Sequence, residues 1–153
     1  MDLNFDDLIP TAKLPRGMRN NNPLNIEAGS FTQSKPGFSG SDGRFAKFGD
    51  MQQGYAAADD LLKVYGTKHG INTVSGVINR WAPPSDGNNV SAYAGTVAKE
   101  LGIGPDDPID LMDPDVRSRM SVAMAKVENG REVPRVMAFS GDKPSNGVDV
   151  RPP

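Results

Sequence analysis

Glu128 is the residue whose type and position suggest the clearest chemistry. It lies near the end of a predicted helix and is followed by Asn129 and Gly130. The helix dipole places partial negative charge at this end, and apolar neighbours would add to its effect, so both favour a protonated carboxyl. Such a carboxyl can act as a general acid toward a leaving glycosidic oxygen. Taken alone, a glutamate at a helix end is more often a solvated surface residue.

An amide-rich segment is the second candidate, and it contains Asn20, Asn21, Asn22 and Asn25. Side-chain amides carry donors and an acceptor, which suits the recognition of N-acetyl groups and sugar hydroxyls. Asparagine also stabilises turns by bonding to nearby backbone. Both interpretations stay open, and we expect Asn22 and Asn25 to face a binding cleft.

Three more residues are candidates for substrate contacts. Trp81 has a ring that can stack on a sugar, although its helical spacing favours a core position. Tyr93 lies on an apolar helical stripe that is also typical of a core. Glu27 is the first candidate for a second carboxylate, although nothing in the sequence raises it above a surface role.

Composition excludes several other kinds of site. The chain of 153 residues has no cysteine and one histidine, His69, so thiolate nucleophiles, disulfides and multi-histidine zinc sites are excluded. We expect no cofactor and no metal. The 17 basic and 19 acidic side chains give a net charge of −2, which does not indicate a nucleic-acid partner. We find neither a signal peptide nor a long apolar stretch, and therefore expect no membrane partner.

The elements that must position these residues are mainly helical. Caps and breakers set the ends of four predicted helices, which run from Met51 to Gly66, Asn72 to Pro83, Asn89 to Gly102 and Asp113 to Gly130. Two short strands are predicted at residues 25–31 and 44–48, joined by the loop SKPGFSGSDG. The expected architecture is an N-terminal arm at 1–15, one α+β domain with a small β-lobe at 16–133, and a proline-rich tail at 134–153.

Longer motifs add a resemblance to a known family. The segment RGMRNNNPLNIEAG, from residue 16, resembles the RGxRNNNPGNI opening of phage-associated lysozyme-like domains, known as virion structural proteins or peptidoglycan transglycosylases. The resemblance continues through GRFAKFGDMQQGYAAADDLL, through HGINTVSGVINRWAPPSDGNNVSAY and to MAKVENG. It covers about residues 16–131. Leu24 stands where the family usually has glycine, and we expect it to take a packing role.

The order of the motifs implies a rearranged lysozyme-like fold. In bacterial wall glucosaminidases the catalytic glutamate precedes an NNLFGI-like segment and a G-R-F strand, whereas here NNPLNI and GRFAKF precede Glu128. This order is that of a circular permutation, which is easy where the termini of a domain lie close together. The hypothesis requires Glu128 to border a groove formed by residues 20–48. The resemblance also places Tyr93 beside Glu128, as in lytic transglycosylases.

The resemblance implies cleavage of the β-1,4 bond between N-acetylmuramic acid and N-acetylglucosamine in peptidoglycan. Glu128 would serve as both acid and base, and the products would be 1,6-anhydro sugars. Lysozyme-type hydrolysis is the alternative, and it usually needs a second carboxylate. A non-catalytic virion or wall-binding protein is the alternative from another class. A phage particle or a secretion assembly would carry the protein to the bacterial cell wall or periplasm.

Overall fold

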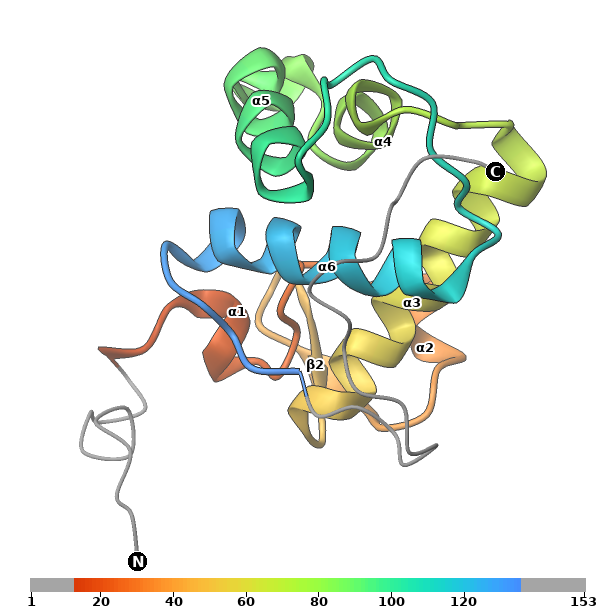
Figure 1. Ribbon diagram of the computed structural model, residues 1–153. Helices are drawn as coiled ribbons and strands as arrows, with labels where there is room; N and C mark the ends of the chain where they lie inside the picture. Colours follow the sequence, from red (N-terminus) through yellow and green to blue (C-terminus); the bar gives the residue numbers. More distant parts are fainter. Residues whose placement is uncertain (1–12, 136–153) are drawn as a thin grey trace, which may run out of the picture.

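The computed structural model describes residues 13–135, so most of the predicted arm and tail lies outside the described residues. In chain order the elements are α1 Arg16–Arg19, α2 Ser30–Gln33, β1 Phe38–Ser41, β2 Ala46–Phe48, α3 Met51–His69, α4 Val74–Trp81, the 3-10 turn η3 Pro84–Asp86, α5 Val90–Leu101 and α6 Pro114–Asn129. Helix α6 runs between α4 and α5 on one side and α1, α3 and the hairpin on the other (Figure 1). The predicted α+β class with a small β-lobe is confirmed.

Helix α6 begins and ends where its sequence predicts. The Asp113 carboxylate accepts from the backbone N–H of Asp115, and Pro114 occupies the first turn. Gly130 ends the helix with φ 68°, a left-handed conformation that glycine adopts without strain. These signals set both ends of the helix, and the Gly130 cap ends it just after the turn that carries Glu128.

Two neighbouring helices are also capped by their own sequences. Asn89 caps α5, and Gly102 ends it in a left-handed conformation, as predicted. Helix α4 is capped by the hydroxyl of Thr73, which accepts from the Gly76 N–H, and not by Asn72 as expected. Both residue types are good caps, so the sequence pattern alone did not separate two adjacent candidates.

Helix α3 continues past Gly66, which was predicted to stop it, and ends at Gly70 with φ 61°. A Cβ at position 66 would lie only 2.9 Å from the Cβ of Leu111. Gly66 therefore allows the segment before α6 to pack closely on α3, and its role is one of space rather than of termination.

The β-lobe differs from its prediction. Residues 25–31 form one isolated bridge, between Glu27 and Phe45, and then enter α2. Asn25 has φ 54°, which an extended strand does not allow. The hairpin instead pairs β2 with β1, and β1 lies in the segment predicted as a loop. Backbone bonds from Ala28 to Arg44 and from Ala46 to Ile26 still hold residues 26–28 beside the hairpin.

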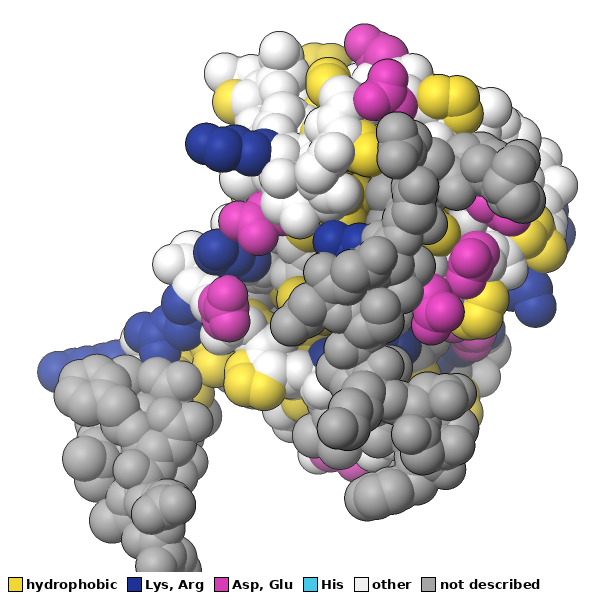
Figure 2. All heavy atoms as spheres, in the orientation of Figure 1, with side chains coloured by type: hydrophobic (Ala, Val, Ile, Leu, Met, Phe, Trp, Pro, Cys, Tyr) yellow, Lys and Arg dark blue, Asp and Glu magenta, His cyan; other side chains and the backbone are white. Residues whose placement is uncertain are grey.

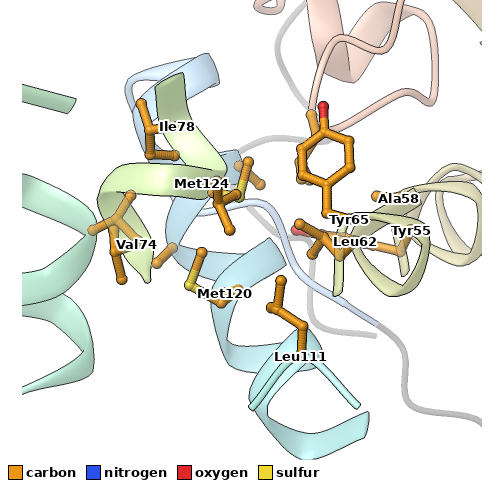
Figure 3. Packing of buried hydrophobic residues seen from close by; sticks show 14 of the residues in the cluster. Tyr55, Ala58, Leu62, Tyr65, Val74, Ile78, Leu111, Met120 and Met124 are labelled. Carbon is orange, nitrogen blue, oxygen red and sulfur yellow. The ribbon is translucent and has the colours of Figure 1, made fainter. Parts of the chain in front are cut away.

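The core lies on both sides of α6. In Figure 3, Met120 and Met124 lie between Val74 and Ile78 of α4 and Leu62 of α3. All five side chains are fully buried. Truncation of a buried methionine or leucine typically costs about 2–5 kcal/mol, so this layer fixes how α3 and α4 sit against α6.

The described surface carries both signs of charge. On the face in Figure 2, acidic and basic side chains are interspersed. Among the described helices we find none with the length and apolar character needed to cross a bilayer.

Candidate active site

A cavity of about 380 Å³ opens between the β-lobe, α3, α4 and the end of α6. Its apolar wall includes Phe31, Phe45, Leu61, Tyr65 and Trp81, and its polar groups are Asn25, Glu27, Arg44, Asp86, Asn88 and Glu128. Aromatic walls with a few convergent polar groups are typical of small-molecule sites. The cavity therefore brings Glu128, Asn25, Trp81 and Glu27 together, as predicted from the sequence.

Glu128 is half-buried in the last turn of α6 and faces this cavity. Its Oε1 accepts a hydrogen bond of 3.0 Å from Nδ2 of Asn25, a residue 103 positions earlier. Glu128 thus borders the groove formed by residues 20–48, as the permutation hypothesis requires. Of the three cavity carboxylates, it is the one with no ion pair among residues 13–135.

Tyr93 of α5 lies on the other side of the same carboxylate. Its hydroxyl donates to the carbonyl oxygen of Met124 at 3.4 Å and lies close enough to Glu128 to interact with that carboxylate. Burial raises the pKa of Tyr93 well above its ordinary value, and the charge and hydrogen bond of Glu128 raise it further. The phenol therefore stays protonated and can donate to the carboxylate. Tyr93 is close to Glu128 as expected, although it does not line the cavity.

Asn22 does not face the cavity, which corrects the expectation for this residue. It is fully buried, and its Nδ2 donates to the carbonyl oxygens of Ile26 and Ala46 at 2.9 Å each. Its Oδ1 accepts from the Ile26 N–H at 3.0 Å. These three bonds join residue 26 to β2, so Asn22 supports the lobe rather than a ligand.

The rest of the NNPLNI motif also has mainly structural roles. The Asn20 amide donates to Asp42, and the Asn21 amide donates to the carbonyl oxygen of Phe48. Leu24 is fully buried and has no positive φ, which confirms its packing role. Asn25 is the one amide of this motif that reaches the cavity.

Trp81 is anchored in the protein and also forms part of the cavity wall. Its indole N–H donates to the carbonyl oxygen of Leu24 at 3.0 Å, and its ring packs edge-on against Tyr65 with centroids 5.7 Å apart. The ring is partly exposed and lines the cavity. A ring held at its nitrogen presents a fixed apolar surface to a ligand.

The second carboxylate candidate, Glu27, is occupied by an ion pair. Both Nε and Nη2 of Arg44 donate to its Oε1, at 3.1 and 3.0 Å. Nη2 of Arg44 also lies 3.9 Å from Asp86, which comes from the opposite side of the cavity. The Glu27 side chain is 63% exposed. Arg44 thus forms ion pairs with both of the other carboxylates that share the cavity with Glu128.

Sequence reasoning missed Arg44, Asp42 and Asp86. Asp42 accepts from the side chains of Arg16 and Asn20 and from the backbone N–H groups of Arg44 and Phe45. These donors, with Arg16 the strongest, hold the pKa of Asp42 well below its ordinary range. Asn20 of the RGMRN segment was the available signal, because it is buried and a buried amide needs partners.

We find no candidate metal site among the described residues. Across residues 13–135 no cluster of three histidine, cysteine, aspartate or glutamate side chains has a geometry that could hold an ion.

Comparison with known proteins identifies a phage relative. The chain is 36% identical to Protein P5 of Pseudoalteromonas phage PM2 over 121 residues, which cover 75% of this chain and 71% of that protein. It therefore belongs to the family of this bacteriophage protein. No family model matches the chain.

Proposed function

We propose that this protein is a peptidoglycan lytic transglycosylase of lysozyme-like type, with Glu128 as its single catalytic acid and base. The observation that carries the proposal is the position of Glu128 in an aromatic-walled cavity, hydrogen bonded by Asn25, beside the buried Tyr93 and free of ion pairs within the described residues. The motifs from RGMRNNNPLNI to VENG support the same assignment, since they meet in space around this carboxylate.

The proposed reaction needs one carboxyl group in two protonation states. Protonated Glu128 gives its proton to the bridging oxygen as the C1–O bond of the muramoyl sugar breaks. The carboxylate then removes the proton from the C6 hydroxyl, whose oxygen bonds to C1. The proton returns to Glu128, and no water is consumed. The attacking hydroxyl belongs to the same sugar, so proximity replaces a positioned water.

The surroundings of Glu128 support a reacting carboxyl held in one position. The Asn25 amide donates to Oε1 at 3.0 Å, and the buried Tyr93 lies beside the same carboxylate.

The ion pair at Glu27 favours transglycosylation over hydrolysis. A hydrolase needs a second carboxylate that acts as base or nucleophile. Glu27 is the sequence candidate, but Arg44 occupies one of its oxygens with two hydrogen bonds. The carboxylate that hydrolysis would need is therefore already engaged in an ion pair.

The biological setting that we propose is a phage particle acting on a bacterial wall. The relationship to a phage protein supports this setting, and local wall digestion by a virion protein would aid genome delivery. The glycan strands of peptidoglycan would be its partners.

Matched variants of two cavity glutamates test the proposal. Purified peptidoglycan is incubated with the native protein, Glu128→Gln and Glu27→Gln, and the loss of turbidity is followed. We expect Glu128→Gln to reduce the rate by about 10²–10⁴-fold and to remain folded, because it removes the proton donor. Glu27→Gln is the control and should stay within a few-fold of native. Clearing by Glu128→Gln at the native rate would refute the mechanism, and a folded native protein without activity would favour a structural virion role.

A further inference from the structure

Asn25 occupies a backbone conformation that few residues adopt. Its φ of 54° lies in the left-handed region, where asparagine is several-fold enriched among residues with a side chain. Its N–H donates to the carbonyl oxygen of Asn22 at 3.0 Å, and the N–H of the next residue, Ile26, donates to the Asn22 side chain. The turn therefore fixes the backbone on both sides of Asn25.

Three consecutive residues of this turn each bond a different part of the site. The carbonyl oxygen of Pro23 accepts from the Asn129 amide at 2.8 Å, and that of Leu24 accepts from the Trp81 indole at 3.0 Å. Asn25 then donates to Glu128 at 3.0 Å. Residues 23–25 are thus aligned with residues 128–129 of α6, and the Asn25 amide points at the carboxylate because its backbone cannot turn away.

The two polar atoms of the Asn25 amide have different surroundings. Nδ2 donates to Oε1 of Glu128, whereas Oδ1 is buried and has no partner. An unsatisfied buried acceptor beside an ionisable group is costly. With Oε1 bonded to Nδ2, the acid proton of a neutral Glu128 lies on Oε2, and Oε1 is then a carbonyl oxygen that still accepts from the amide. The same hydrogen bond can therefore hold either protonation state.

We propose that Asn25 is a positioning residue that holds Glu128 in both protonation states and leaves Oε2 as the oxygen that exchanges protons with the sugar. This inference rests on the proposed function and replaces the expected role of Asn25 in sugar recognition. In the resting state Nδ2 bonds the carboxylate. When Glu128 is protonated on Oε2, Oε1 is its carbonyl oxygen and still accepts from Nδ2.

Other charged groups near Glu128 can also influence its titration, and their effect must be distinguished from that of Asn25. The titratable groups that face it or share its cavity are Tyr93 of α5, Tyr65 of α3, Glu27 and Arg44 of the β-lobe and Asp86 of η3. From α1, Arg16 pairs with Asp42 instead. Asn88 provides a matched control, because it also lines the cavity but bonds the Pro83 carbonyl oxygen and not Glu128.

The test follows the Glu128 carboxyl directly by nuclear magnetic resonance. The chain has four glutamates, so selective ¹³C labelling of the carboxyl carbon gives few signals, and Glu128→Gln identifies the relevant one. We compare native protein, Asn25→Asp and Asn88→Asp. Asn25→Asp places a second carboxylate in contact with Glu128, and we expect the titration midpoint to rise by about 1 pH unit or more. Asn88→Asp should change it far less.

A kinetic measurement on soluble glycan strands completes the test. A positioning role predicts a lower kcat, a nearly unchanged KM and, because Glu128 must start protonated, an alkaline limb of the pH profile displaced to higher pH in Asn25→Asp. A raised KM with native kcat, or a carboxyl midpoint no different from that of Asn88→Asp, would overturn the inference. Should Asn25→Asp not fold, Asn25→Gly retains the left-handed backbone, and must show the same loss of kcat. If Asn25→Asp raises the titration midpoint of Glu128 but the native protein cleaves no glycan, the proposed function is refuted and the interaction between Asn25 and Glu128 stands.

Discussion

Replacement of Asn22 with alanine should destabilise the β-lobe severely. The substitution removes three buried hydrogen bonds of 2.9–3.0 Å. At about 1 kcal/mol for each, the loss is about 3 kcal/mol. The Ile26 carbonyl oxygen keeps a second donor, the Ala46 N–H, but the Ile26 N–H loses its acceptor within the lobe. This buried N–H would then lack an acceptor, and solvent water cannot replace the lost hydrogen bond.

The assay is thermal or urea unfolding of native protein, Asn22→Ala and the control Asn88→Ala. For a chain of this size, about 3 kcal/mol corresponds to a decrease in Tm of about 6–12 °C. Asn88 is exposed and makes one bond, of 3.1 Å, so its replacement should change the stability by less than about 1 kcal/mol. An Asn22→Ala variant with native Tm and weakened sugar binding would refute the structural role and restore the expected place of Asn22 in the cleft.

Three further predictions concern pH and packing. Burial raises the pKa of all three tyrosines, Tyr55, Tyr65 and Tyr93. The unfolded chain therefore loses phenolic protons first, and Tm should fall as pH rises above about 10; an unchanged Tm at pH 11 would contradict this. Asp42 has a lowered pKa, so Asp42→Asn should reduce Tm at pH 7, and the difference should shrink as pH falls below the ordinary value of 3.8; a constant difference down to pH 2 would refute it. Gly66→Ala should be destabilised relative to Gly95→Ala by about 1–3 kcal/mol in urea unfolding, because only the former would crowd Leu111; equal stabilities would contradict the packing role.

Helices that carry their own boundary signals could be predicted from the sequence. Asp113, Pro114 and Gly130 each act on backbone groups within one turn of their own position, so the limits of α6 depend on local chemistry alone. Gly66 shows the opposite case. Glycine is needed at position 66 because Leu111 packs closely against it. Leu111 is 45 positions away in the sequence, so no local pattern contains this contact.

The β-lobe could not be predicted well for a related reason. Asn25 adopts a positive φ because distant groups hold its neighbours, and this conformation interrupts the strand that its sequence suggests. Asn22 and Asn25 are the same residue type three positions apart, yet one is buried in the lobe and the other faces Glu128. Residue type predicted that amides would be used, but only the fold decides which one reaches the site.

The central claim is that Glu128 acts as both acid and base on a glycan without a second carboxylate. Mass spectrometry of the sugars released from purified peptidoglycan tests it most directly, with Glu128→Gln as the matched control. The account predicts 1,6-anhydro muropeptides from the native protein and none from the variant. Muropeptides with free reducing ends would instead mean that water is the acceptor, and would contradict the single-carboxylate mechanism.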